Sequence, residues 1–178
     1  MRALLVKFFG NERGAAVIEM ALVAPVLALG VIGIVDVSNA YSRKLALEQG
    51  VQRAVEKIMN TTENATVEAT LANEVQCQVN GSTTSGGTTT CNTSATQNIT
   101  VTWRLDCTTG GTTTSTSTTS STTYDALVTA CVSPSTKAGY VQVTVTDKYS
   151  PMFPIHFAVF NTSDSTYHLA ATAGVRTL

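Results

Sequence analysis

The stretch that decides the fold runs from Arg13 to Val35 and reads RGAAVIEMALVAPVLALGVIGIV. From Ala15 onward it is apolar except for one acid, Glu19. Its length is about what a helix needs to cross the hydrocarbon core of a bilayer. A carboxylate costs roughly 2.5–3.5 kcal/mol at the centre of an inserted helix, and less near its end. The stretch therefore predicts a membrane helix over 15–35 whose charge needs a partner.

The residues just before Glu19 indicate what that partner is. If the chain were cut after Gly14, Ala15 would carry a free amine, and Glu19 would become the fifth residue of the product. About one helical turn separates the two residues, so the new positive charge and the carboxylate would compensate each other.

Charge elsewhere in the chain sets orientation and excludes one class of partner. The short N-terminal flank is basic, which predicts that this flank stays in the cytoplasm and that the remainder is exported. Its charged residues are Arg2, Lys7, Glu12 and Arg13. The formal net charge of the whole chain is −1, whereas a nucleic-acid-binding protein usually shows a basic stripe. We expect no nucleic-acid partner.

The helical pattern continues past the apolar stretch. Apolar residues recur at roughly helical spacing as far as Ile58, with charged residues on the other faces. One helix over 15–59 would be about 65 Å long, with a transmembrane half and an amphipathic half. We interpret Asp36 as the end of the span, with an ion pair to Arg43 of a neighbouring copy as the alternative.

The remainder, 60–178, is expected to form a small exported head that is mainly β-structure. A short helix is predicted over 65–74. Alternating apolar and polar residues predict strands over 98–106, 139–147 and 167–177. The fold class is therefore α+β, with a long N-terminal helix followed by a small antiparallel sheet.

Two head segments consist almost entirely of Thr, Ser and Gly, over 81–90 and 108–123. They have no apolar side chains to bury, so we expect flexible outer loops, with adhesion as a candidate role. Because Thr favours strands, an extended hairpin is the alternative for the longer segment.

The four cysteines all lie in the exported part, and they are Cys77, Cys91, Cys107 and Cys131. An even number in an oxidising compartment predicts two disulfides, and the spacings do not fit a zinc site. Four cysteines allow three different pairings, and the sequence leaves all three open. Short loops favour Cys77–Cys91 with Cys107–Cys131.

Nothing in the sequence indicates catalysis. His156 and His168 lie in separate segments without an acid and a nucleophile around them, so we interpret both as structural. The many hydroxyls have no partner base, and no phosphate loop or metal cluster is present in the sequence pattern. We expect no enzymatic activity, no cofactor and no metal.

The stretch from Arg13 to Glu19 resembles the type III signal of type IV prepilins, in which a membrane peptidase cuts after the Gly on the cytoplasmic face. The longer stretch from Gly14 to Leu27 resembles the start of TadE-like minor pseudopilins of the tight-adherence (Flp, type IVc) system. Their pattern is roughly Gly-x-x-x-Val-Glu-Phe-Ala-Leu-x-x-Pro, and Met20 stands here in place of the aromatic residue.

The C-terminal end also resembles this family, with a Val-rich strand, Tyr149, a Pro-containing turn and a closing strand before Arg176. The resemblance implies a leader, 1–14, removed between Gly14 and Ala15, and Glu19 acting as the assembly charge. The implied partners are a prepilin peptidase, other pilin subunits, an inner-membrane assembly platform and, before assembly, membrane lipid. The implied location is the bacterial inner membrane with the head outside, and then an extracellular pilus.

Two other interpretations remain open. The chain could be an uncleaved, signal-anchored TadG-like envelope protein that scaffolds the assembly machine. It could also be a secreted protein with an ordinary signal peptide cut after Ser38-Asn39-Ala40, although the apolar run exceeds the usual core of such signals.

Overall fold

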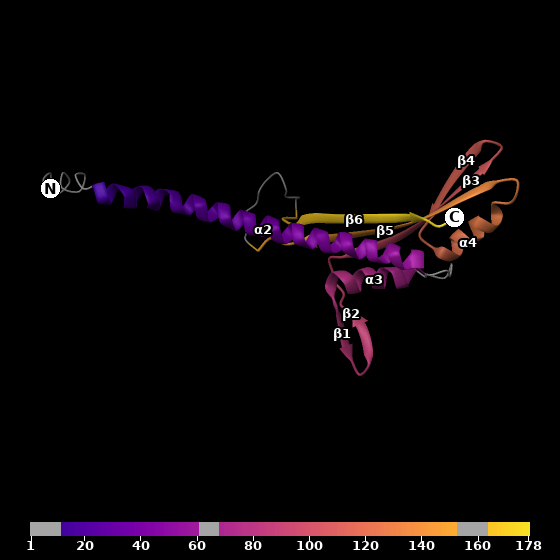
Figure 1. Cartoon of the computed structure of the whole chain (residues 1–178), viewed down its shortest axis with the longest axis horizontal. Helices are drawn as coiled ribbons and strands as arrows, with labels where there is room; N and C mark the ends of the chain where they lie inside the picture. The colour runs from indigo at the N-terminus through magenta and orange to yellow at the C-terminus, as the bar shows by residue number, and fades with distance from the viewer. Residues whose placement is uncertain (1–11, 61–67, 153–163) are drawn as a thin grey trace.

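The molecule is built along one long helix. The computed structural model describes residues 12–60, 68–152 and 164–178. Helix α2, Glu12–Asn60, spans 49 residues and runs through Pro25 as one element. Its N-terminal half extends beyond the rest of the protein, and its C-terminal half lies along the head (Figure 1). The predicted leader falls largely on residues 1–11, which are outside the described residues.

The head contains a four-stranded antiparallel sheet with strand order β4-β3-β5-β6. Its strands are β3 Asn98–Thr109, β4 Thr112–Thr118, β5 Thr136–Tyr149 and β6 Tyr167–Arg176. Three of them coincide with the strands that alternation predicts. The long apolar helix followed by antiparallel sheet confirms the α+β class.

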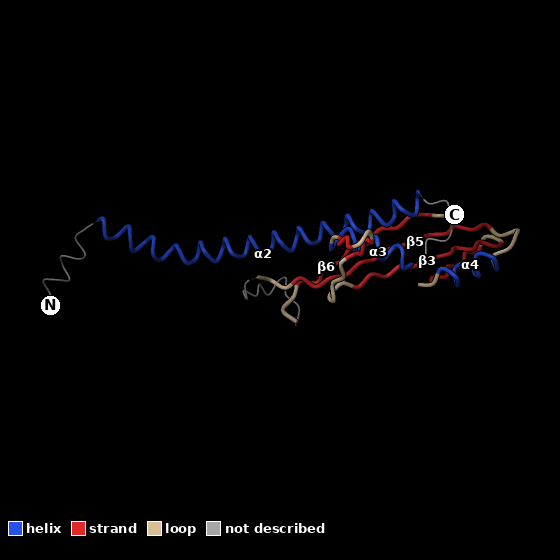
Figure 2. The backbone as a smooth tube through the Cα atoms, turned by 90° about the horizontal axis from the view of Figure 1, so that it is seen from below, coloured by secondary structure: helices blue, strands red, loops and turns tan. Residues whose placement is uncertain are grey.

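One face of the sheet forms the core, because apolar residues occupy alternate positions on the central strands. The register places Val143 of β5 opposite both Val101 of β3 and Ala173 of β6. Helix α2 covers this face with Leu47, Val51 and Ala54, all almost completely buried. Figure 2 shows the second half of α2 lying over the strands, with the first half free of them.

Two shorter helices complete the core. Helix α3, Glu68–Asn80, packs on α2 and buries Leu71 and Val75, and it extends past the predicted range of 65–74. Helix α4, Ser121–Ala130, was not predicted. The Ser120 hydroxyl caps it by accepting a bond from the Thr123 amide, as N-cap serines do.

The expectation of loops over 81–90 and 108–123 was wrong. The first segment forms a hairpin of β1 Ser82–Ser85 with β2 Thr88–Cys91, and the second contributes the end of β3, strand β4 and the start of α4. Each hairpin turns through two glycines with positive φ, as a type I′ turn requires. These turn glycines are Gly86, Gly87, Gly110 and Gly111. The hairpin alternative therefore applies to both segments, and β-branched Thr suits extended backbone without any burial.

Candidate functional site

The N-terminal half of α2 is an apolar surface that the described residues of the head leave largely exposed. Among the described residues, α2 is the one helix that is long and apolar enough to cross a membrane. Its most apolar stretch of 18 residues is almost entirely unburied. Its large exposed apolar side chains up to the end of the stretch are Val17, Ile18, Met20, Leu22, Val23, Val26, Leu27, Leu29, Val31, Ile34 and Val35. Such a surface needs lipid or other apolar helices around it, because it far exceeds the patches that soluble proteins expose.

The predicted cleavage site, between Gly14 and Ala15, lies within α2 close to the first described residue, Glu12. Glu19 is exposed on the uncovered half. Helical side chains lean toward the N-terminus of their helix, so the Glu19 carboxylate is directed back toward Ala15. The roles of Gly14, Ala15 and Glu19 in processing and assembly stay predictions.

The polar side chains that fasten α2 to the head begin where the apolar stretch ends. Asp36, Asn39 and Arg43 are spaced three and four residues apart, so they share one face of α2. Asp36 is only 3% exposed, and its Oδ1 accepts a bond of 2.9 Å from the backbone amide of Met152. The amide of Asn39 lies 3.6 Å from the Met152 sulfur. Asp36 was interpreted from the sequence only as the end of the membrane span, and nothing there indicated that it holds the residues that follow β5 against α2.

Arg43 connects three separate elements. Its Nε donates to Asp147 of β5 at 2.8 Å, and its two terminal nitrogens donate to the Val79 carbonyl at 3.2 Å and to the Asn80 side chain at 2.9 Å. The planar guanidinium suits this use, since its donors are held in a fixed fork. Arg43 is thus bonded within its own chain. The alternative that pairs Asp36 with Arg43 of a neighbouring copy stays a prediction.

Tyr149, at the end of β5, also belongs to this junction. Burial raises the pKa of its hydroxyl above the ordinary value, and the nearby Asp36 carboxylate raises the pKa further. The ring of Tyr149 stacks on that of Tyr167, with centroids 6.2 Å apart. The two side chains therefore form an aromatic pair at the end of the sheet that is closest to the apolar half of α2.

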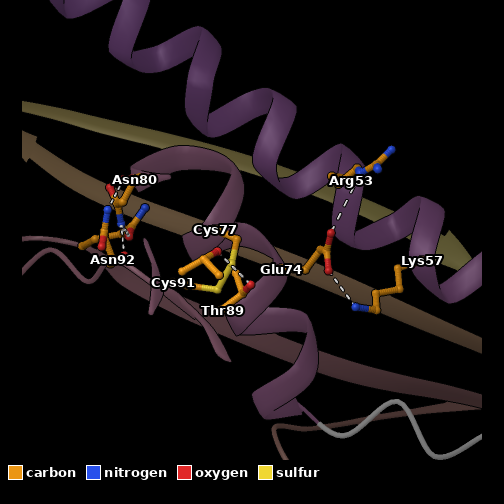
Figure 3. The surroundings of a disulfide bond; sticks show 10 residues. Arg53, Lys57, Glu74, Cys77, Asn80, Thr89, Cys91 and Asn92 are labelled. Atoms are coloured by element: carbon orange, nitrogen blue, oxygen red, sulfur yellow. Dashed lines mark hydrogen bonds and ion pairs between the residues drawn. A yellow bond between two sulfur atoms is a disulfide. The ribbon is translucent and has the colours of Figure 1, made fainter. Parts of the chain in front are cut away.

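The disulfides hold the far parts of the head. Cys77 pairs with Cys91, and Cys107 pairs with Cys131; this is the pairing that short loops favour. Figure 3 shows the first bond joining α3 to the end of β2. One turn before it, Glu74 reaches back to α2 and accepts a bond of 2.6 Å from Lys57.

Asn80 and Asn92 strengthen the base of the same hairpin. Each side-chain amide donates to the backbone carbonyl of the other residue at 3.1 Å.

The described part of the chain contains no group of His, Cys, Asp or Glu that could hold a metal ion.

Comparison with known proteins gives one match. Residues 14–56 match the family model for TadE-like protein. The matched region begins at Gly14 and includes the exposed apolar half of α2, Asp36 and Arg43, and the core residues that α2 supplies, Leu47, Val51 and Ala54. No curated protein and no solved structure matches the chain. Over residues 14–56 this chain is therefore TadE-like, as its sequence pattern predicted.

Proposed function

We propose that this chain is a structural subunit of a Tad (Flp-like, type IV) pilus, cut after Gly14 by a prepilin peptidase and assembled through α2. The TadE-like match supports involvement in the Tad pilus system. The observation that carries the finer proposal is the start of that match at Gly14, directly before the uncovered apolar half of a continuous helix.

Processing is chemically reasonable at this position. A peptidase needs an extended backbone around the bond that it cuts. Gly has the lowest helix propensity after Pro, so unwinding the helix at Gly14 costs less free energy than unwinding it at most other residue types. The basic flank holds this bond on the cytoplasmic side, and the head lies on the outer side of the membrane.

Assembly then exchanges one apolar environment for another. Before assembly the exposed side chains of α2 contact lipid, and in a filament they contact helices of other subunits. Helices in lipid associate through packing and polar contacts rather than through the hydrophobic effect. A charge pair between the Ala15 amine and Glu19 would add such a polar contact.

The mature N-terminus is the measurement that tests this proposal. We expect mass spectrometry of the membrane-bound protein to show a start at Ala15. An intact Met1 would instead favour the uncleaved TadG-like envelope protein, and a start at Tyr41 would favour an ordinary signal peptide. Against the last alternative, Ser38–Ala40 lie inside α2, where Asn39 contacts the head.

A matched pair of glycine variants sharpens the test. Gly14→Leu should leave the leader attached, since the bulky side chain hinders access to the bond. Gly10→Leu changes another glycine of the same flank and should be processed normally. Normal processing of Gly14→Leu would contradict the proposed cleavage site.

A further inference from the structure

One end of the head lies level with the end of the apolar half of α2. The bond between the Met152 amide and Asp36 fixes this level, because Asp36 is the residue that follows the apolar stretch. In Figure 1 the end of β5 and the start of β6 lie beside the middle of α2, while the end of β6 lies near the C-terminus of α2 and the start of β5 lies beyond it. A bilayer that surrounds 15–35 would therefore reach the β5–β6 end of the head.

An apolar and an aromatic side chain are exposed at this level, beside the exposed Lys44 and His168. Met152 is 69% exposed and Tyr41 is 62% exposed. A groove of about 370 Å³ lies between α2 and β6, with Val37, Ala40, Tyr41, Tyr167 and Leu169 among its lining residues. In the sequence Met152 is followed by residues 153–160, FPIHFAVF, which are outside the described residues.

The position of Tyr41 along α2 is consistent with the depth of the lipid headgroup layer. The headgroup layer is roughly 5–7 Å thick on each side of the hydrocarbon core. The helix rises by about 9 Å between Val35, where the span ends, and Tyr41 at 1.5 Å per residue. Because helical side chains lean toward the N-terminus of their helix, the Tyr41 ring is directed back toward this layer, where Tyr and Trp side chains are enriched in membrane proteins.

The charges nearby are compensated in pairs. Lys148 lies 2.8 Å from Asp164, and Lys44 lies 3.8 Å from Glu48. His168 also contacts Asp164, at 2.9 Å. A contact with lipid at this end would thus depend on apolar and aromatic groups rather than on attraction to anionic headgroups, and it should change little with salt.

We propose that, before assembly, the β5–β6 end of the head lies on the outer surface of the membrane, with Met152 and Tyr41 in the headgroup layer. The partner is a lipid surface, and the inference rests on the proposed insertion of α2. Extraction of the subunit would then break contacts of the head with lipid as well as those of the helix.

Three tryptophan variants test this in the full chain, reconstituted in phosphatidylcholine–phosphatidylglycerol vesicles that contain brominated lipid. Met152→Trp reports on the proposed contact. Val132→Trp, at a 65% exposed residue near the opposite end of the sheet, is the matched control, and Val26→Trp, at a 67% exposed residue, reports on the span. The native Trp103 is buried and is common to all three variants.

We expect lipid brominated near its headgroup to quench Met152→Trp at least threefold more than Val132→Trp, and lipid brominated deep in its chains to quench Val26→Trp. Quenching of Val26→Trp without Met152→Trp would overturn the inference and leave the span intact. Absence of quenching at Val26→Trp would overturn both.

The role of Asp36 is tested in the Met152→Trp background. Asp36→Leu removes the acceptor of the Met152 amide bond and should reduce the quenching at least twofold. Asp36→Asn keeps an acceptor oxygen and should retain most of it. Equal quenching in both variants would show that Asp36 does not hold the head at the surface.

Discussion

Arg43 and Asp147 form an ion pair of 2.8 Å that joins the long helix to the central strand of the head. The Asp147 side chain is 3% exposed and that of Arg43 is 26% exposed, so water screens the pair little. Asp147 also accepts bonds from the Thr96 hydroxyl at 2.7 Å and from the Lys148 amide at 2.9 Å. The pair thus lies at the centre of a network that makes α2 and the sheet one unit.

Replacing Arg43 by Ala should lower the free energy of unfolding by about 2–3 kcal/mol, because it leaves the buried Asp147 carboxylate without its cation. Arg53→Ala is the matched control on the same helix, since Arg53 is 60% exposed and pairs with the exposed Glu56 at 3.4 Å and, more distantly, with Glu74 at 3.9 Å. A surface pair of that kind contributes about 1 kcal/mol or less. Urea unfolding in detergent, followed by Trp103 fluorescence, measures both. Equal losses would contradict the assigned importance of the Arg43–Asp147 pair.

Removal of one disulfide should lower the stability of the whole head, whereas removal of the other should destabilise only one hairpin. Cys131 is buried in the core, whereas Cys91 lies at the end of an exposed hairpin. For loops of 14 and 24 residues, the loss of loop-closure entropy in the unfolded chain predicts a stabilisation of about 3 kcal/mol for each disulfide. We expect the double variant Cys107→Ala/Cys131→Ala to lose roughly that amount in global unfolding.

The double variant Cys77→Ala/Cys91→Ala should mainly speed amide hydrogen exchange in β1 and β2. Exchange at β3 and β5 provides the internal control. If their protection falls as much as that of the hairpin, the hairpin is coupled to the core and this prediction fails.

Two glycines of α2 allow a test of the contact between helices. A Cβ at Gly50 would lie 2.7 Å from the Val79 side chain of α3, whereas one at Gly30 would meet nothing within 4 Å. Overpacking costs about 1–3 kcal/mol, partly offset by a gain of about 1 kcal/mol in helix propensity. Gly50→Ala should therefore destabilise the head by about 1 kcal/mol, and Gly30→Ala should not. Equal unfolding midpoints would show that α2 and α3 separate easily here.

Arg104 and Asp106 supply a prediction about pH. The bond from Arg104 holds the pKa of the Asp106 carboxyl below its usual range, and a bond from Ser115 adds to this. The two side chains are joined by contacts of 2.9 and 3.0 Å. Since the pKa is lower in the folded state, the pair stabilises the head above the unfolded-state pKa, near 4. This contribution is lost as the pH falls through the folded-state pKa.

Carboxyl NMR between pH 2 and 6 should show that Arg104→Met raises the pKa of Asp106. Lys137→Met removes a cation from the adjacent strand that bonds to the Val128 carbonyl instead, and it should leave that pKa in place. An unchanged Asp106 pKa in Arg104→Met would assign the shift to another cause.

How far the sequence predicted this structure depended on whether a segment buries a face. The long helix and the three strands that line the core have periodic apolar residues, and these residues reveal them. Strands β1, β2 and β4 are almost entirely exposed. Their only signals were β-branched Thr and the Gly-Gly pairs Gly86-Gly87 and Gly110-Gly111, which a composition-based interpretation does not use. Helix α4 did carry a signal, since Tyr124, Leu127 and Val128 have helical spacing.

The junction was harder to predict. Asp36 and Arg43 are charged residues on an expected helix, and nothing local shows that their partners lie more than a hundred residues later, at Met152 and Asp147. Gly14 and Glu19, by contrast, are close in the sequence, so a relationship between them can be proposed from spacing alone, and it stays a prediction.

Glu19→Ala tests that relationship. After a cut at Gly14, the Ala15 amine would lie at the positive end of the helix dipole, where a cation is unfavourable and a carboxylate is favourable. Removing a charge from the span lowers the cost of insertion, so we expect the variant to insert and be processed, yet to enter filaments poorly. Glu48→Ala, on the outer half of α2, is the control. The amounts in sheared filaments and in membranes measure both, and normal incorporation of Glu19→Ala would contradict the charge pairing.

The partner of Glu19 can be identified in cells that make wild-type and Glu19→Ala subunits together. If Glu19 pairs with the amine of its own chain, only the variant should be excluded, and wild-type incorporation should stay normal. If it pairs with the amine of a neighbour, a variant subunit leaves an adjacent wild-type amine unpaired, so wild-type incorporation should also fall as the variant is increased. Glu19 lies on the half of α2 that the head does not cover, so a neighbouring chain can reach it, and we expect the second outcome.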